Sequence, residues 1–398
     1  MDLTQLLAFT MQNRASDLHI SSGSPPIIRV SGHMKRVKGD PLSPEVMREM
    51  IYSVMTDDQR TEYEKNMELD FAVAFGEKAR FRVNAFNTRR GPAAVFRTIP
   101  TEVPTMAELE LPPIMRRFAE LEKGIILVTG PTGSGKSTTL ASLINHINLT
   151  QAKHIITIED PVEFFHESKK SLINHRELGA DTKSFKNALK SALREDPDVI
   201  LVGEMRDHET ISLALTAAET GHLVFGTLHS SSASKTIDRI IDVFPTGDKE
   251  MVRAMLSSSI QGVVAQTLLS RADGMGRVGA FEILVGTSAV RNLIRENQIP
   301  QIFSMMQTGS RYGMITMEDA VRDLLESGQI SEEEAHRALL KSSDEGGTDV
   351  GEEGAYGAAA LGGGKIPTGE PTRSQSHGHA TTSGSGSESQ KAEGGYSF

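Results

Sequence analysis

The 398-residue sequence contains no cysteine. Disulfides, thiolate zinc sites and cysteine nucleophiles are therefore excluded. The sequence also lacks an apolar run long enough to cross a bilayer, and its N-terminus lacks the basic segment and apolar core of a secretory signal. Together these absences predict a cytoplasmic protein.

An excess of positive charge is also missing. The chain has 42 basic and 52 acidic residues, which gives a formal net charge of -10. A protein whose main partner is nucleic acid or an anionic lipid surface usually carries the opposite balance. We therefore expect no nucleic-acid partner, although a local basic patch is compatible with this composition.

Residues 1–99 have the pattern of a small α+β domain. The amphipathic segment 3–12 predicts a helix, and Ser43 followed by Pro44 is typical of a helix start. Strands are predicted at 17–21, 27–32, 69–75, 80–88 and 93–99, with a hairpin turn at 89–92. The proline-containing segment 100–113 is interpreted as a linker.

Residues 114–341 show alternating apolar strands and helices, which indicates a parallel sheet with helices on its faces. Buried strands are predicted at 124–130, 154–160, 199–204 and 222–229, and helices at 184–195 and 210–221, the second ending at Gly221. The rest is predicted to be helical: 249–269, 288–297, 316–327 and a helix opening with the capping box at Ser331.

Residues 342–398 are rich in Gly, Ser, Thr, Glu and Ala. Such a segment cannot bury enough apolar surface to offset its chain entropy, so we expect a disordered tail. His377 and His379 form an H-x-H pair in this tail, but no third ligand is nearby, which favours a solvated segment over a metal site.

The segment "GPTGSGKST" matches the phosphate-binding pattern G-x-x-x-x-G-K-[ST] and lies between an apolar strand and a helix. Its glycines allow backbone N–H groups to surround a phosphate chain at the positive end of a helix. We predict that Lys136 binds the β and γ phosphates of a nucleoside triphosphate, whose base the motif does not specify, and that Ser137 binds Mg²⁺. The predicted nucleotide-binding residues are Gly130, Pro131, Thr132, Gly133, Ser134, Gly135, Lys136, Ser137 and Thr138.

Acidic residues follow two of the other predicted strands. Glu159 and Asp160 end one strand, with Glu163 one turn further on. Since ligands of parallel α/β sheets bind at the carboxyl ends of the strands, we expect at least one of these acids to act on magnesium or water, and assign Glu159 and Asp160 to the metal with Ser137. An ordinary strand-to-turn transition before proline is the alternative.

"VILVGE" raises a question, because a magnesium-binding aspartate often ends such a strand and here the residue is Gly203. Glu204 remains, and we predict that it polarises the attacking water; a surface acid paired with Arg206 is the alternative. His229, at the end of the next predicted strand, is a candidate sensor of the γ-phosphate. His222 starts that strand, so sheet geometry places it away from the phosphates.

Four segments together resemble the Walker A, Asp-box, Walker B and His-box motifs of secretion-type ATPases: "GPTGSGKST", "IITIEDPVEF", "ALREDPDVILVGEMRD" and "TAAETGHLVFGTLHSSSASKTIDRI". Within that superfamily, residues 1–340 resemble the PilT family of type IV pilus retraction ATPases, including "ASDLHI", "ARFRVNAF" and "AVRNLIRE" at 289–296. In this superfamily the Walker B strand commonly lacks the magnesium aspartate, which accounts for Gly203.

The resemblance implies an α/β fold, with a PAS-like domain at residues 1–99 and a RecA-like P-loop ATPase domain at 114–341. It further implies a homohexamer that hydrolyses ATP to ADP and phosphate and drives pilus retraction and twitching motility. Arginine fingers from the N-terminal domain would complete the site; Arg80, Arg82 and Arg97 are the candidates, and the sequence does not choose among them. Arg239 is another possible contact.

The implied partner is an inner-membrane platform protein (PilC-like), which the ring would contact from the cytoplasmic face without membrane insertion. "AVRNLIRE" is an amphipathic helix whose charged residues the resemblance assigns to the coupling of hydrolysis and retraction. An accessory retraction paralogue, another secretion or pilus assembly ATPase, a nucleic-acid motor and a non-enzymatic nucleotide switch are the alternatives. The lack of cysteine argues against the extension ATPases, which usually have a four-cysteine zinc motif.

Overall fold

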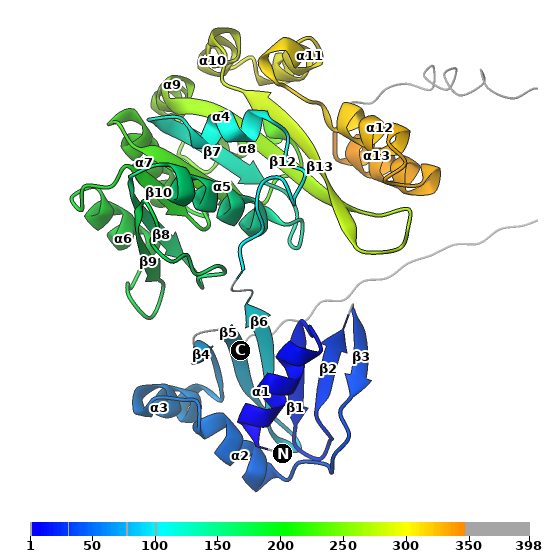
Figure 1. Ribbon diagram of the computed structural model, residues 1–398. Helices are drawn as coiled ribbons and strands as arrows, with labels where there is room; N and C mark the ends of the chain where they lie inside the picture. Colours follow the sequence, from blue (N-terminus) through cyan, green and yellow to red (C-terminus); the bar gives the residue numbers. More distant parts are fainter. Residues whose placement is uncertain (1, 31, 77–78, 100–101, 347–398) are drawn as a thin grey trace, which may run out of the picture. The chain divides into compact units, whose positions relative to one another are not determined.

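The computed structural model describes residues 2–30, 32–76, 79–99 and 102–346, and two β-sheets organise this part of the chain (Figure 1). The linker residues 100 and 101, the histidine pair at 377 and 379, and the tail beyond 346 lie outside the described residues. No helix among the described residues is long and apolar enough to span a membrane.

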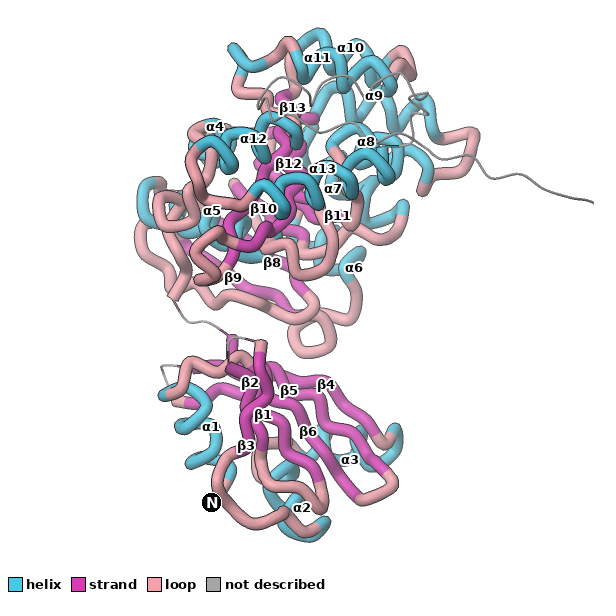
Figure 2. The backbone as a smooth tube through the Cα atoms, turned by 90° about the vertical axis from the view of Figure 1, so that its right-hand side faces the viewer, coloured by secondary structure: helices cyan, strands magenta, loops and turns pink. Residues whose placement is uncertain are grey.

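The first sheet is antiparallel throughout, with the strand order β3-β2-β1-β6-β5-β4 (Figure 2). Its strands are β1 Asp17–Ser21, β2 Ile27–Val30, β3 His33–Arg36, β4 Glu68–Phe75, β5 Ala79–Thr88 and β6 Gly91–Ile99. The helices are α1 Leu3–Gln12, α2 Pro44–Tyr52 and α3 Asp57–Asn66. One apolar cluster joins the helices to the sheet, including Leu6, Met47, Phe81 and Phe96.

Local sequence signals account for many of the helices and strands in residues 1–99. Helix α1 has the predicted bounds, and α2 begins at Pro44, with the side chain of Ser43 accepting a hydrogen bond from Val46 N. The predicted hairpin at 89–92 joins β5 to β6. The sequence analysis missed β3, whose residues are all exposed, and α3, which has only one buried residue. Neither element carries an apolar pattern, so both are absent from the prediction.

The second sheet has the strand order β13-β12-β7-β11-β10-β8-β9. Its strands are β7 Gly124–Thr129, β8 His154–Glu159, β9 Leu172–Glu177, β10 Val199–Val202, β11 Leu223–Leu228, β12 Ile260–Ser270 and β13 Arg277–Val285. All neighbouring pairs are parallel except β12 and β13. The four predicted buried strands are thus neighbours in one parallel sheet, as expected.

Helices cover both faces of this sheet. The remaining elements are α4 Ile114–Ala119, α5 Lys136–Thr150, α6 Phe185–Ala192, α7 His208–Glu219, α8 Ala233–Asp242, α9 Lys249–Ser259, α10 Ser288–Arg295, α11 Ile302–Gln307, α12 Met317–Glu326 and α13 Glu332–Gly346, with short 3-10 helices at Ile299–Gln301 and Ser310–Tyr312. Side chains of α4 and α5 form the core on one face, and those of α6 to α9 form it on the other. Gly221 follows α7 with φ 115°, as its predicted role at the helix end requires.

Two predictions about the C-terminal half were wrong. Residues 249–269 are not one helix, because α9 ends at Ser259 and β12 begins at Ile260. Strand β12 is buried on both faces, so its apolar residues do not alternate and cannot be distinguished from a buried helix by periodicity. The predicted tail boundary at 342 was also early, since α13 continues to Gly346.

Candidate nucleotide site

The carboxyl ends of β7, β11, β10 and β8 meet at one edge of the second sheet, because these four strands are parallel neighbours. The phosphate-loop segment follows β7, His229 follows β11, Gly203 and Glu204 follow β10, and Asp160 follows β8. His222 lies at the opposite end of β11, where its Nδ1 is 2.9 Å from the carbonyl oxygen of Ala217. The sheet therefore separates the two histidines as the sequence analysis expected.

The phosphate-loop segment 130–138 turns sharply between β7 and α5. Gly130, Gly133 and Gly135 have φ values of 142°, 80° and 89°, a range that favours glycine. A Cβ atom on Gly130 would lie 2.3 Å from the carbonyl oxygen of Gln266, so this position also has no room for a side chain. Helix α5 begins directly after Gly135, which places the positive end of the helix dipole at the loop.

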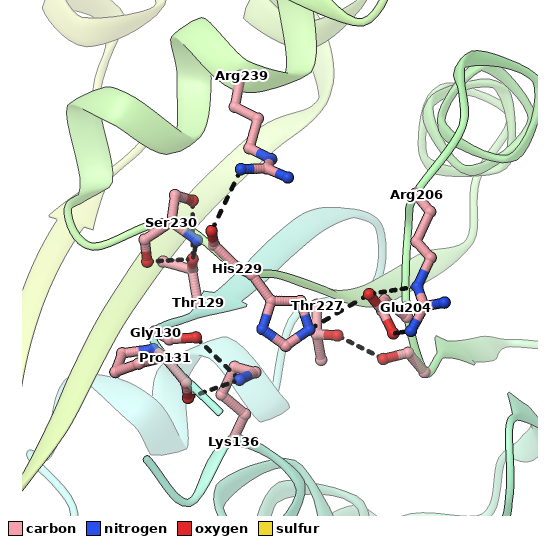
Figure 3. A network of polar contacts seen from close by, with 11 residues as sticks. Thr129, Gly130, Pro131, Lys136, Glu204, Arg206, Thr227, His229, Ser230 and Arg239 are labelled. Carbon is pink, nitrogen blue, oxygen red and sulfur yellow. Dashed lines mark hydrogen bonds and ion pairs between the residues drawn. The ribbon is translucent and has the colours of Figure 1, made fainter. Parts of the chain in front are cut away.

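Lys136 is the cation of this loop. It is 9% exposed, and its Nζ donates hydrogen bonds to the carbonyl oxygens of Gly130 at 2.9 Å and Pro131 at 3.0 Å (Figure 3). Burial lowers the pKa of Lys136, and the negative charges of Glu163 and Glu204 oppose this effect. A buried ammonium group near two carboxylates and a helix N-terminus is suited to holding phosphate oxygens.

Glu204 lies between two cationic or polar side chains. Nε of Arg206 is 2.5 Å from Oε1 of Glu204, its Nη2 is 2.6 Å from Oε2, and Nε2 of His229 is 3.2 Å from Oε1 (Figure 3). The hydrogen bond from Arg206 is the main reason that the pKa of Glu204 lies below its usual value, and it outweighs the effect of burial. Glu204 is therefore an oriented, ionised carboxylate. It pairs with Arg206 and also lies at the candidate site, so the two expectations from the sequence do not exclude each other.

Gly203 follows β10 and is hydrogen-bonded to both neighbouring strands, its N–H donating to the carbonyl oxygen of Ile158 in β8 at 2.8 Å. The hydroxyl of Thr227 donates to the carbonyl oxygen of Gly203. A Cβ atom on Gly203 would lie 3.1 Å from the Cα of Glu159 and 3.2 Å from its Cγ. An aspartate at position 203 would therefore pack tightly against the main chain and side chain of Glu159.

The three acids after β8 have different surroundings. Burial raises the pKa of Glu159 to about 7; its Oε1 lies 4.0 Å from Nδ1 of His175, and Thr157 and the main chain of Glu163 donate hydrogen bonds to its carboxyl group. Glu163 is exposed, and its charge acts on Lys136. The charge of Asp160 acts on Arg206. Of the predicted acids, Glu163 and Glu204 are thus the two whose charges bear on Lys136.

A cavity at this edge is lined by Lys136, Ser137, Glu163, Glu204 and His229. The described residues contain no cluster of three His, Asp or Glu side chains placed to hold a metal. A hydroxyl with one or two carboxylates nevertheless fits Mg²⁺, which takes oxygen ligands and keeps several waters or substrate phosphates. Ser137 and the acids after β8 are the residues that could hold it.

Two of the candidate arginines, Arg82 and Arg97, form ion pairs within the first sheet. Arg82 and Arg97 are direct neighbours across β5 and β6. Arg82 pairs with Asp70 at 3.5 Å, and Arg97 pairs with Asp17 at 2.9 Å. Burial would raise the pKa of Asp17, but the hydrogen bond from Arg97 contributes to holding it below its usual value. Both arginines are more than 40% exposed at the side chain, so they can exchange these partners for another anion.

Arg80 lies on β5 two residues before Arg82. Arg239, the fourth candidate, lies on α8 and donates to the carbonyl oxygen of His229 at 3.4 Å (Figure 3). Arg239 thus contacts the main chain of His229, and its contact with the nucleotide stays a prediction.

Sequence reasoning missed two residues of β12 and β13. Nε2 of Gln266 donates to the carbonyl oxygen of Ser134 at 2.6 Å, and Nη1 of Arg277 lies 3.5 Å from the carbonyl oxygen of Gly133. Both touch the phosphate loop from strands that lie more than 125 residues further along the chain. The β-branched run Val263–Val264 in "GVVAQTLL" was the available signal for a strand here.

Comparison with known proteins shows the family of the chain. The family described as "Type II/IV secretion system protein" matches residues 1–337. Over 335 residues the chain is 56% identical to the type IV pilus retraction ATPase PilT of Pseudomonas aeruginosa, covering 84% of this chain and 97% of the relative. It is 59% identical to a twitching motility protein of Neisseria gonorrhoeae over 335 residues, 83% of this chain and 90% of the relative.

A solved structure of a PilT protein also matches this chain. The crystal structure of the pilus retraction motor PilT with bound ADP matches with a TM-score of 0.80 and 47% sequence identity, covering 85% of this chain and 97% of that one. The α/β fold predicted from the sequence is thereby confirmed. The chain belongs to the type II/IV secretion system protein family, and within it to the PilT family of pilus retraction ATPases.

Proposed function

We infer that this chain is an ATPase subunit of the motor that powers type IV pilus retraction and twitching motility. The observation that carries this inference is the arrangement of Lys136 and Glu204 at one sheet edge, a phosphate-loop cation opposite an oriented carboxylate. A site that only bound nucleotide would need the first residue but not the second. Membership of the PilT family assigns the work that hydrolysis performs.

The residues have separate roles in hydrolysis. Lys136 exchanges the carbonyl oxygens of Gly130 and Pro131 for β- and γ-phosphate oxygens of ATP, which are better acceptors for an ammonium group. Glu204 orients and polarises the attacking water. His229 contacts Glu204 through its ring and Arg239 of α8 through its carbonyl oxygen, which supports a role in sensing the γ-phosphate.

Magnesium neutralises charge that develops on the phosphates. We propose that Ser137 holds it directly. Glu163 is better placed than Glu159 to bind its waters, because Glu163 is exposed and its charge acts on Lys136, while the side chain of Glu159 is only 12% exposed. Asp160 remains a further candidate for the same waters.

The assembly is proposed to be a homohexamer with a PAS-like domain at 1–99, a linker at 100–113 and a RecA-like domain at 114–341 in each subunit. Arg80, Arg82 or Arg97 would complete a nucleotide site as a finger. Binding and loss of the γ-phosphate would draw the domains together and release them. The ring would act at the cytoplasmic face of the inner membrane on a PilC-like platform protein.

Lys136→Ala tests this function. The variant should lose ATP hydrolysis by the purified full-length chain, and it should not restore twitching when expressed in a strain from which this gene has been deleted. The wild-type chain should hydrolyse ATP when purified and should restore twitching to the deletion strain. If the wild-type chain bound ATP but never hydrolysed it in assembled rings, a nucleotide switch would replace the motor, and DNA-stimulated hydrolysis would favour a nucleic-acid motor.

Twitching also separates the retraction motor from its relatives. A retraction motor predicts that the deletion strain keeps surface pili and loses twitching. An assembly or extension ATPase predicts that the deletion strain loses the pili themselves. An accessory paralogue predicts that twitching persists in part without this chain.

A further inference from the structure

Strand β12 contacts the phosphate loop through one side chain. Gln266 is 3% exposed, and its Nε2 donates a 2.6 Å hydrogen bond to the carbonyl oxygen of Ser134. Its Oε1 has no hydrogen-bond partner among the described residues. The donation to Ser134 is therefore the only hydrogen bond that this buried amide makes in the described part of the chain.

The main chain at Gln266 also shapes the loop. A Cβ atom on Gly130 would lie 2.3 Å from the carbonyl oxygen of Gln266, and one on Gly135 would lie 3.2 Å from its Nε2. Two glycines of the loop thus leave room for the same residue of β12. The register brings this about, since Ala265 pairs with Thr129, the last residue of β7.

The contact at Ser134 determines where the next amide points. In a trans peptide the C=O and N–H groups point in opposite directions. When Gln266 holds the Ser134 carbonyl towards β12, the N–H of Gly135 in the same peptide points away from β12. That N–H belongs to the turn that leads into α5, where main-chain N–H groups bind phosphate.

We propose that Gln266 is a positioning residue for nucleotide binding, which fixes the Ser134–Gly135 peptide so that the Gly135 N–H is directed at the phosphates. This inference rests on the proposed nucleotide site. Gln266 does not touch the reacting atoms, so its loss acts on the affinity for nucleotide more than on the rate of the bound complex. If Gln266 only stabilised the fold, its loss would not change the affinity for nucleotide more than the rate of the bound complex.

The chain contains a matched control on the same strand. Nε2 of Gln261 donates to the carbonyl oxygen of Lys123 at 3.2 Å, at the other end of β7. Gly124 leaves room for Gln261, as the loop glycines do for Gln266, because a Cβ atom there would lie 2.4 Å from Cγ of Gln261. Gln261 therefore has the same kind of contact with the same strand, but at the edge away from the phosphate loop.

The experiment compares Gln266→Met and Gln261→Met in the full-length chain, because methionine keeps the length of the side chain and removes the donor. ADP affinity in the presence of Mg²⁺ is measured by calorimetry, and KM and kcat by steady-state ATP hydrolysis. We expect Gln266→Met to weaken ADP binding and raise KM about 3- to 10-fold, as expected for one lost hydrogen bond, while kcat changes less than twofold. Gln261→Met should keep the wild-type affinity and KM.

Gln266→Glu is the second variant. It keeps the shape of the side chain but places an acid beside the loop, so it should weaken ADP binding more than Gln266→Met does. Wild-type ADP affinity in Gln266→Met, or equal losses in both methionine variants, would overturn the proposal. Lys136→Ala, measured in parallel, distinguishes a failure of the role proposed for Gln266 from a failure of the nucleotide-site assignment. If Lys136→Ala binds ADP and hydrolyses ATP normally, the nucleotide site itself is misassigned.

Discussion

Gly203 packs against Glu159: a Cβ atom on the glycine would lie 3.1 Å from the Cα of Glu159 and 3.2 Å from its Cγ. The residue that looked like a lost magnesium ligand is therefore a site of close approach between β10 and β8. A side chain here would make contacts tighter than most Cβ contacts, so the end of β8 would have to give by a few tenths of an ångström. The nearby acids after β8 offer other oxygens for the same ion.

Replacing Gly203 by aspartate should therefore destabilise the protein without improving its use of magnesium. We expect a loss of about 1–3 kcal/mol in the free energy of unfolding, because the added side chain overpacks the strand junction. Urea unfolding and the magnesium dependence of hydrolysis are the measurements. Gly247→Asp is the control, since a Cβ atom there meets nothing within 4 Å. A stable variant with tighter magnesium dependence would contradict the packing argument.

The Glu204→Gln variant should still bind nucleotide but should lose most of its ATP hydrolysis. The amide keeps the size of the side chain but cannot accept a proton or polarise water, so kcat should fall about 10²- to 10⁴-fold. ADP affinity, measured by calorimetry, should stay within a few-fold of the wild-type value, because Lys136 and the loop are unchanged. Normal turnover in this variant would remove Glu204 from the proposed mechanism.

Arg206 should affect hydrolysis through Glu204. Its side chain is 76% exposed, so Arg206→Ala should change the free energy of unfolding by less than about 1 kcal/mol. The carboxylate would lose its two-point contact, and we expect kcat to fall several-fold with KM little changed. In a double variant with Glu204→Gln, the substitution of Arg206 should cause no further loss of kcat. An additive loss would indicate that Arg206 acts on the phosphates directly.

Two arginines of α10 should separate structure from coupling. Arg291 donates to the carbonyl oxygens of Gly286 and Ser258 and to Oε1 of Gln261, at 2.8, 2.7 and 3.0 Å. Arg295 is exposed and has no side-chain partner among the described residues. Arg291→Ala should therefore lower the melting temperature. Arg295→Ala should keep stability and most ATPase activity but impair twitching, and wild-type twitching in that variant would assign α10 to the core alone.

The buried carboxyl group of Glu282 should make stability fall as pH rises. Burial raises its pKa, although its Oε1 accepts a 2.6 Å hydrogen bond from the N–H of Ala233 at the start of α8 and the N–H of Met317 at the start of α12 also donates to the carboxyl group. Between the unfolded and folded pKa values the folded chain holds one more proton than the unfolded chain, so stability is lost as pH rises through that range.

Glu282→Gln removes this titration. The difference in unfolding free energy between wild type and variant should therefore shift in favour of the variant as pH is raised from about 4.5 towards neutrality. Urea unfolding of both proteins across that range is the measurement. A difference that stays constant with pH would show that Glu282 has its ordinary pKa in the folded chain.

Local signals predicted most of the secondary structure. Helix caps and turns act over a few residues, and the predictions for α1, α2, β1 and the β5–β6 hairpin agree with the structure for that reason. The error at β12 has the opposite cause. Its residues are buried on both faces by elements distant in the chain, and a sequence window contains no record of that burial.

The chemical identity of the site was available from the sequence alone. A phosphate loop between a strand and a helix, with acids after the neighbouring strands, restricts the chemistry to a nucleotide because each of those residue types is required for it. Lys136, Glu204 and His229 could be named as candidates for this reason, and their position at one edge of the sheet followed from the parallel strands.

Only the tertiary structure decided which distant residues contact one another. It brought His229 to Glu204, placed Gly203 close to Glu159 of β8, and brought Gln266 to the phosphate loop. Each of these contacts joins residues whose distance depends on strand order and register. Those are set by the packing of the whole sheet, so no local stretch of the sequence contains them.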